Sequence, residues 1–303
     1  MSEAAFKSGF VSIIGRPNVG KSTLLNTIIG EKITIVSDKP QTTRNKILGV
    51  KHLPGVQIVF MDTPGIHKPR HKLNEYMVKT ALSTFDEVDI ILFMIEAGEP
   101  SGPGDRYGDR YILEMLTKVT KPVFLLINKI DSVPKNMVLP QIEEYRHLYP
   151  FKEFFPVSAL CGDNIDSLLE SIIQELPEGP QYFSEDIATD QPMRFIAAEI
   201  IREKIFQLTY QEIPYSIAVG IEDFKEMEDR NLAVIRGVIF VERDSQKGII
   251  IGKGGAMLKK VGQLAREEIE AIMGIKVFLE LWVKVKEKWQ SDDQVLKMLG
   301  YKA

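Results

Sequence analysis

Residues 15–22 read Gly-Arg-Pro-Asn-Val-Gly-Lys-Ser, which is a complete GxxxxGK[ST] phosphate-binding loop. A short apolar run, Phe10–Ile14, predicts a buried strand before the loop, and Ser22–Ile29 predicts a helix after it. Glycines in such a unit let backbone N–H groups face an anion at the helix N-terminus. We expect Lys21 to reach the β- and γ-phosphates of a nucleotide and the Ser22 hydroxyl to bind Mg²⁺. The nucleotide-binding residues predicted from this segment are Gly15, Asn18, Val19, Gly20, Lys21, Ser22 and Thr23.

Two further motifs follow in the order expected of a GTPase. Asp62-Thr63-Pro64-Gly65 comes after a predicted strand, Val56–Met61. Asp62 is expected to hold Mg²⁺ through a water, and the N–H of Gly65 is expected to face the γ-phosphate. Asn128-Lys129-Ile130-Asp131 matches the NKxD element, and its final carboxylate can accept hydrogen bonds from both N1–H and the exocyclic amine of guanine. The predicted base pocket consists of Asn128, Lys129, Asp131, Ser158 and Ala159.

A switch segment is predicted between the first helix and a hairpin of two short strands. Pro40-Gln41-Thr42-Thr43-Arg44 offers two threonines, one of which should complete the Mg²⁺ shell when GTP is bound. Thr43 is the favoured ligand and Thr42 is the alternative. The predicted Mg²⁺ set is therefore Ser22, Thr43 and Asp62.

The water-aligning residue of many GTPases is missing here. The position directly after the Asp-x-x-Gly motif is Ile66, whose apolar side chain cannot orient a water. Asn18 in the phosphate-binding loop offers an amide oxygen that can hold a monovalent cation near the β–γ bridge. K⁺ is therefore a candidate cofactor beside Mg²⁺.

Alternating apolar runs and helical stretches predict an α/β fold with a doubly wound, mostly parallel sheet, whose ligands bind beyond the carboxyl ends of the strands. Leu176-Pro177-Glu178-Gly179-Pro180 interrupts this pattern. We predict a GTPase domain over 1–176, a linker over 177–191 and a small α+β domain over 192–303. Gly104-Asp105-Arg106-Tyr107 is repeated at once over 108–111, and the repeat is expected to lengthen the loop before a helix.

The second predicted domain contains a GxxG sequence, Gly252-Lys253-Gly254-Gly255, expected as a glycine loop between a strand and a helix. The stretch Ser245–Arg266 around it carries five Lys or Arg residues and no acid, although the chain has a net charge of −4. Glycines allow close approach to a nucleic-acid backbone, and Ile249–Ile251 should line an apolar groove under single-stranded bases. This pattern predicts a type II KH domain. The predicted RNA-binding residues are Lys247, Ile249, Ile251, Gly252, Lys253, Gly254, Gly255, Lys259 and Lys260.

The amino-acid composition is that of a globular protein and argues against disulfide-rich and membrane-spanning classes. The chain is 44% hydrophobic and 26% charged, as in ordinary globular proteins. The single cysteine, Cys161, excludes an internal disulfide framework and fits a reducing cytoplasm. No apolar run approaches the roughly 18–20 residues of a membrane span.

Together these motifs resemble the Era family, bacterial P-loop GTPases with a C-terminal KH domain. The resemblance covers nearly the whole chain, and Ile66 agrees with it because the family carries an apolar residue there. It implies binding of 16S rRNA near its 3′ end, a role in assembling the 30S subunit and coupling of RNA affinity to the nucleotide state. It also implies partial peripheral association with the inner face of the cell membrane. Related potassium-activated GTPases carry an Asn where Asn18 stands, and we expect a monomer.

Three other functions are weighed against the motifs of this sequence. A P-loop kinase or ATPase does not account for Asn128-Lys129-Ile130-Asp131, and a signalling G protein does not account for the GxxG domain. A GTP-regulated RNA-binding module with little or no hydrolysis is the third, and the intact Lys21, Ser22 and Asp62 argue against a vestigial nucleotide site.

Overall fold

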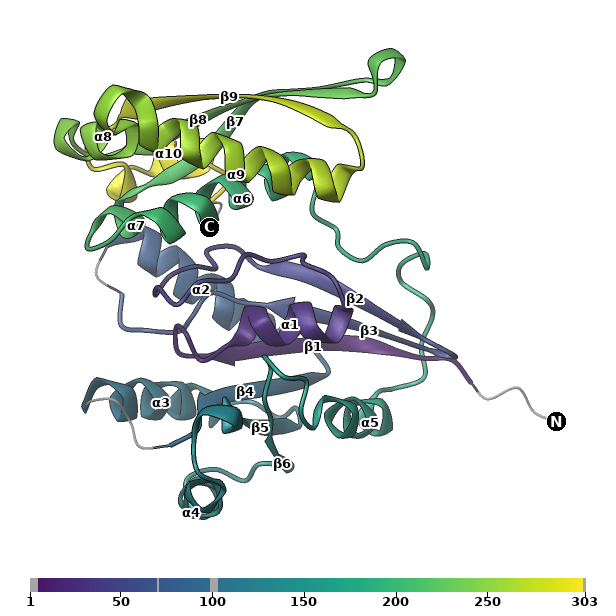
Figure 1. Cartoon of the computed structure of the whole chain (residues 1–303). Coiled ribbons are helices and arrows are strands. Elements are labelled where there is room, and N and C mark those ends of the chain that lie inside the picture. Colours follow the sequence, from purple (N-terminus) through teal and green to yellow (C-terminus); the bar gives the residue numbers. More distant parts are fainter. Residues whose placement is uncertain (1–4, 70, 99–102, 302–303) are drawn as a thin grey trace.

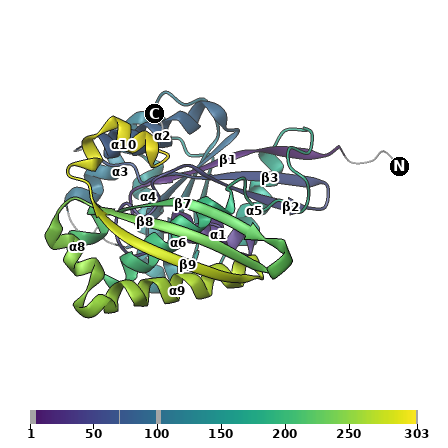
Figure 2. The same ribbon diagram turned by 90° about the horizontal axis from the view of Figure 1, so that it is seen from above.

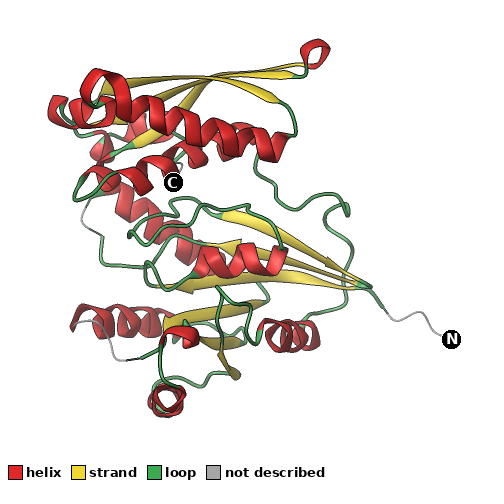
Figure 3. Cartoon of the chain, viewed as in Figure 1, coloured by secondary structure: helices red, strands yellow, loops and turns green. Residues whose placement is uncertain are grey.

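The computed structural model describes residues 5–69, 71–98 and 103–301, with backbone only for 103–106. Two sheets lie in separate parts of the molecule, each with its own helices (Figure 1). The amino-terminal part, purple to teal, lies below the carboxy-terminal part, green to yellow. Figure 3 shows that long irregular segments connect the elements near the boundary between these parts.

The larger sheet has six strands in the order β2-β3-β1-β4-β5-β6. Only β2 and β3 pair antiparallel, and every other neighbouring pair is parallel. The predicted doubly wound, mostly parallel sheet is therefore confirmed. Its elements are β1 (Lys7–Gly15), α1 (Lys21–Ile29), β2 (Ile47–Leu53), β3 (Val56–Asp62), α2 (Lys72–Glu87), β4 (Ile90–Glu96), α3 (Pro103–Leu116), β5 (Val123–Asn128), η1 (Ile130–Ser132), η2 (Lys135–Met137), α4 (Val138–Arg146), β6 (Glu153–Pro156) and α5 (Ile165–Glu175).

Helices cover both faces of this sheet, so its central strands are apolar on both sides. Consecutive residues of β1 show the alternation, because Ile13 packs with α1 and α5 whereas Ile14 packs with α2, α3 and α4. β4 and β5 are almost entirely buried. This rigid layer presents the carboxyl ends of β1, β3 and β5 at one edge, where the three nucleotide motifs begin.

The smaller sheet has three strands, with β7 and β8 antiparallel and β8 and β9 parallel. Helices α6 and α9 pack on one face, and Figure 2 shows the other face of the sheet uncovered. This arrangement confirms the predicted small α+β KH-type domain. Its elements are α6 (Met193–Leu208), α7 (Ile213–Ser216), β7 (Ala218–Met227), η3 (Glu228–Arg230), β8 (Leu232–Val241), α8 (Asp244–Ile251), η4 (Lys253–Gly255), α9 (Ala256–Met273), β9 (Lys276–Val285), η5 (Trp289–Ser291) and α10 (Asp293–Met298).

The segment between α5 and α6 lies against the larger sheet. The N–H of Val50 in β2 donates to the carbonyl of Ala188 at 2.8 Å, and the Thr189 hydroxyl donates to the carbonyl of Leu48 at 2.7 Å. This connection is therefore attached to an edge strand over part of its length. The boundaries 1–176, 177–191 and 192–303 stay predictions.

Two local predictions were wrong. The tandem repeat over 104–111 forms the first turns of α3 and not a loop, because four residues add about one helical turn and keep the helix in phase. Residues 245–251 form helix α8, where we expected only the approach to a glycine loop. None of the described helices is both long and apolar enough to cross a membrane.

Candidate functional site: a nucleotide site and a separate glycine turn

The phosphate-binding loop connects β1 to α1 and lies against the segment after β3. A Cβ atom added at Gly65 would lie 2.6 Å from the backbone nitrogen of Pro17, so only glycine allows this close approach. Gly20 immediately before α1 has φ of 103°, a backbone conformation that favours glycine. The loop and the Asp62–Gly65 segment therefore form one continuous surface at the helix N-terminus.

Lys21 is the buried cation of this surface. Its Nζ atom donates to the carbonyl of Arg16 at 2.9 Å and to that of Gly15 at 3.3 Å. Burial lowers the pKa of Lys21 to about 8, opposed by the nearby Asp62 carboxylate and assisted by the Arg16 guanidinium. An ammonium that is held by two carbonyls and stripped of water has a strong electrostatic preference for an anion.

Three oxygen-bearing side chains converge beside the loop. The Ser22 hydroxyl donates to Asp62 Oδ2 at 2.7 Å, and Thr43 Oγ1 lies 2.8 Å from Ser22 Oγ and 3.3 Å from the same carboxylate oxygen. Asp62 is fully buried, and its Oδ1 atom has no hydrogen-bond partner among the described residues. Burial also raises the pKa of Asp62, so a cation here would favour its ionised form.

These residues fit Mg²⁺, which prefers carboxylate and hydroxyl oxygens. Mg²⁺ bound here would neutralise charge on the terminal phosphates. Of the two candidate threonines, the geometry favours Thr43, because the Thr42 hydroxyl donates instead to the carbonyl of Lys39 at 2.6 Å. Thr43 thus contacts the other two predicted metal ligands, Ser22 of α1 and Asp62 of β3.

The base end of the site is built around Asn128. Its Nδ2 atom donates to the carbonyl of Val19 at 2.8 Å, and its Oδ1 atom accepts from the N–H of Ala159 at 2.8 Å. Asn128 therefore joins the phosphate-binding loop to the 158–159 loop. The Ser158 hydroxyl in turn donates to Asp131 Oδ1 at 2.6 Å, and Lys129 forms an ion pair with Glu96 at 2.9 Å.

A cavity of about 210 Å³ lies between the phosphate-binding loop and the 35–43 segment. It is lined by most of the predicted phosphate-loop residues, by Thr43 and Gly65 and, from the predicted base pocket, by Lys129, whereas Gly15, Val19, Asp62, Asn128, Asp131, Ser158 and Ala159 are not part of its lining. It also contains a stretch of the 35–43 segment, which forms one wall. The predicted site residues that line the cavity are Asn18, Gly20, Lys21, Ser22, Thr23, Thr42, Thr43, Gly65 and Lys129.

Ile66 and Asn18 occupy different environments at the phosphate end. Ile66 is fully buried and packs with Ile14 and Met61, so its side chain belongs to the core. Asn18 is bound to the switch segment, because its Nδ2 atom donates to the carbonyl of Asp38. The Asn18 amide and a main-chain carbonyl of the switch segment are thus neighbours.

One contact at the site was missed by sequence reasoning. Arg16 Nε donates to Asp109 Oδ1 at 2.7 Å, and the Tyr145 hydroxyl donates to Asp109 Oδ2 at 2.9 Å. Asp109 lies in the tandem repeat, which we expected only to lengthen a loop. It fixes the second residue of the phosphate-binding loop to α3 and α4, and the repeat itself was the only signal in the sequence that pointed to this region.

The predicted RNA-binding residues lie apart from the nucleotide cavity, around the turn from α8 to α9. Within the described part of the chain, none of the lysines at 247, 253, 259 and 260 takes part in an ion pair. Gly254 has φ of 60°, and a Cβ atom added there would meet nothing within 4 Å. The backbone of this turn is therefore open to a ligand, with uncompensated positive charge around it.

The apolar residues of α8 divide between the core and the surface. Ile249 is 49% exposed, whereas Ile250 is fully buried among α6, α9 and the sheet. Ile251 is partly buried at the edge of the same core. The expectation that all three isoleucines line one groove was therefore wrong for Ile250, since successive residues of a helix face different directions.

Comparison with known proteins agrees with this geometry. Residues 10–129 match the family described as 50S ribosome-binding GTPase, and residues 212–290 match the KH domain family. The GTPase Era of Geobacter metallireducens is 58% identical over 99% of this chain and 100% of its own length. Two solved structures, each 46% identical and covering 98% of this chain and 100% of their own, superpose with TM-scores of 0.93 and 0.91. The first is Era with MgGDPNP and nucleotides 1506–1542 of 16S ribosomal RNA, and the second is a variant of Aquifex aeolicus Era bound to GDP.AlF4-.

The fold and the site define a P-loop GTPase with an appended KH domain, whose activity is the hydrolysis of GTP to GDP and phosphate. Mg²⁺ accompanies the nucleotide in the first of these structural relatives, and the residues found here fit that ion. The chain belongs to the Era family.

Proposed function

We propose that this chain binds 16S rRNA near its 3′ end through the turn between α8 and α9 and acts in assembly of the 30S ribosomal subunit. The observation that carries the proposal is the open space at Gly254 and Gly255 of the turn, surrounded by lysines that have no ion-pair partner in the described chain. The structural relative solved with 16S nucleotides supports the choice of RNA, because it matches this chain over both domains.

The resemblance to the family supports a switch role, in which the nucleotide at the first domain controls RNA affinity at the second. It also supports a cytoplasmic monomer with weak peripheral contact at the inner face of the membrane. We include K⁺ as a cofactor held by Asn18, since Ile66 is buried and does not align a water. The position of Asn18 beside the carbonyl of Asp38 supports a cation site made by the loop and the switch segment.

The experiment compares two glycine variants at opposite ends of α9. Gly254→Asp places a negative charge in the proposed RNA contact, and Gly274→Asp places the same group at the other end of the helix. Both glycines have positive φ values, 60° and 69°, and open space at the Cβ position, so the backbone cost is matched. Binding of a single-stranded oligonucleotide with the 3′-end sequence of 16S rRNA is measured by fluorescence anisotropy.

Gly254→Asp should weaken RNA binding by about tenfold or more, because an added anion opposes phosphate contacts. Gly274→Asp should bind within about twofold of the parent protein, since that end of the helix makes no phosphate contact in the proposal. Full-strength binding by a folded Gly254→Asp protein would place the RNA surface elsewhere.

A further inference from the structure

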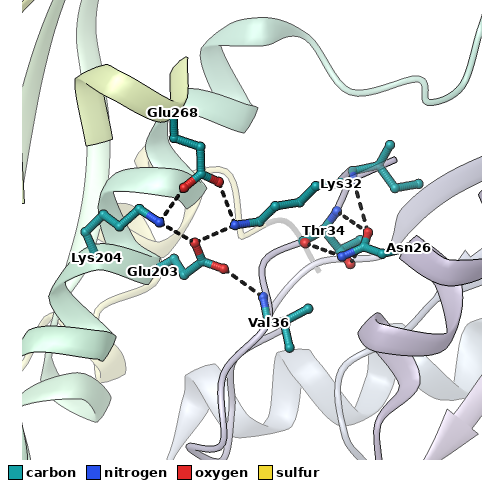
Figure 4. Close-up of polar contacts among 8 residues, drawn as sticks. Asn26, Lys32, Thr34, Val36, Glu203, Lys204 and Glu268 are labelled. Atoms are coloured by element: carbon teal, nitrogen blue, oxygen red, sulfur yellow. Dashed lines mark hydrogen bonds and ion pairs between the residues drawn. The ribbon is translucent and has the colours of Figure 1, made fainter. Parts of the chain in front are cut away.

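The switch segment, residues 30–46 between α1 and β2, is in contact with the second domain along most of its length. Figure 4 shows its upstream half, where Lys32 Nζ lies 2.6 Å from both Glu203 of α6 and Glu268 of α9. The other Glu203 oxygen accepts from the N–H of Val36 at 3.0 Å, and Lys204 completes the cluster by pairing with both glutamates. These contacts attach the switch segment to the second domain at Lys32 and at Val36, upstream of Thr43.

The downstream half is held by two buried arginines on either side of Thr43. Arg202 of α6 donates to the carbonyl of Thr42, and its charge is balanced by Glu199. Arg202 reaches from the second domain to the switch segment, and Arg44 reaches from the switch segment into the second domain. Its Nη1 atom donates to the carbonyl of Ile217 at 2.7 Å, and the guanidinium lies 5.7 Å from the Trp289 ring centroid.

Both guanidinium groups are removed from water, with each arginine only 1% exposed. Arg44 contacts main-chain carbonyls, an aromatic face and the Tyr301 hydroxyl at 3.5 Å, all from the second domain, whereas its Nε atom has no hydrogen-bond partner among the described residues. A buried charge is expensive unless such partners surround it. The partners that compensate part of the cost of burying Arg44 are therefore present only when the second domain is docked against the switch segment.

We propose that the second domain positions Thr43 for GTP hydrolysis, with Arg44 and Arg202 as the positioning residues. Successive Cα atoms lie about 3.8 Å apart, so anchoring the Thr42 carbonyl and the Arg44 side chain leaves Thr43 little freedom. Thr43 is then held with its hydroxyl toward Ser22 and Asp62. The proposal concerns hydrolysis and does not depend on RNA binding.

The test uses the full-length Arg44→Met protein, with Arg146→Met as control. Met fills similar volume without the charge or the hydrogen bonds, and Arg146 is an exposed arginine of α4 remote from the switch segment. Three quantities are measured: affinity for GDP and for a non-hydrolysable GTP analogue, the Mg²⁺ concentration that half-saturates hydrolysis, and deuterium exchange of residues 36–46.

For Arg44→Met we expect hydrolysis to fall about 10- to 100-fold, the range produced by displacing a positioned group by about 1 Å. Affinity for the GTP analogue should fall while GDP affinity stays within about twofold, because only the triphosphate state uses Thr43. The half-saturating Mg²⁺ concentration should rise, and exchange of 36–46 should accelerate. Arg44→Lys should restore part of the rate, since it keeps the charge without the planar donor geometry.

Wild-type Mg²⁺ dependence and analogue affinity in Arg44→Met would overturn the proposal. An equal loss of GDP and analogue affinity would also overturn it, because that result indicates a purely structural role. If Arg44→Met fails to fold, Arg202→Met tests the same claim at the Thr42 carbonyl, with the same expected and contradicting results.

Discussion

The Ser158 hydroxyl donates a hydrogen bond to Asp131 Oδ1 across 2.6 Å. Ser158 is fully buried, whereas Asp131 is exposed at the open end of the nucleotide site. The contact thus fixes a solvent-accessible carboxylate to a rigid loop that is itself joined to Asn128. A carboxylate held in this way supports selection of guanine by its two neighbouring N–H donors.

Asp131→Asn should change the base preference from guanine toward xanthine, because the amide replaces one acceptor by a donor. GTP affinity should fall by about a hundredfold or more, as expected when a site built to accept two hydrogen bonds from the base loses one acceptor. Competition between GTP and XTP for a fluorescent nucleotide measures the change. Unchanged GTP affinity in the variant would remove Asp131 from the base pocket.

Nucleotide binding should take up protons near pH 8. Burial lowers the pKa of Lys21 to about 8, so this ammonium is partly deprotonated there in the free protein, whereas bound phosphates favour its protonated form. Affinity should therefore decline as pH rises through 8. Calorimetry in buffers of different ionisation enthalpy should show uptake of about half a proton at pH 8 and almost none at pH 6.

The control for this titration is Lys21→Arg, whose guanidinium stays protonated in this range. Any residual binding by that variant should show no proton uptake assigned to position 21. Buffer-independent heats for the parent protein at pH 8 would contradict the lowered pKa.

Hydrolysis should be faster in K⁺ than in Na⁺ at equal ionic strength, because we propose that Asn18 helps to hold the cation beside the switch segment. Asn18→Ala should remove the difference between the two salts. The rates are followed by phosphate release. Equal rates of the parent protein in both salts would refute the cation site.

Lys253→Ala should weaken RNA binding and reduce the slope of log affinity against log salt by about one unit, as expected when one phosphate contact is lost. Lys276→Ala is the control, because that lysine lies just beyond the far end of α9 and pairs with Glu270. An unchanged slope in Lys253→Ala would show that this lysine does not contact phosphate.

The proximity of the predicted nucleotide residues could be foreseen because these residues follow strands in a fixed order. Ser22, Asp62 and Asn128 each lie within a residue or two of an element that the apolar pattern predicts, and a parallel sheet brings their ends to one edge. Thr43, the favoured metal ligand, lies beside Ser22 and Asp62, whereas the Thr42 hydroxyl donates to the carbonyl of Lys39.

The contacts between the domains were not predictable from the sequence. Arg44 and Ile217 are 173 residues apart, and neither local periodicity nor a motif marks their pairing. Helix α8 was missed because Ile249–Ile251 is a short apolar run that suits a strand, a loop edge or a helix equally well. Ile250 is buried and Ile249 is exposed because of the way α8 is rotated against its neighbours in space, which the local sequence does not specify.

RNA crosslinking with sequencing, in the presence of a GTP analogue and then of GDP, tests the proposed function most directly. Total ribosomal RNA is offered to the full-length protein, and crosslinked peptides and nucleotides are identified together. The account predicts crosslinks between residues 247–260 and the 3′ end of 16S rRNA, with a yield that differs between the two nucleotide states. Crosslinks that map elsewhere in ribosomal RNA, or that arise outside 247–260, would contradict it.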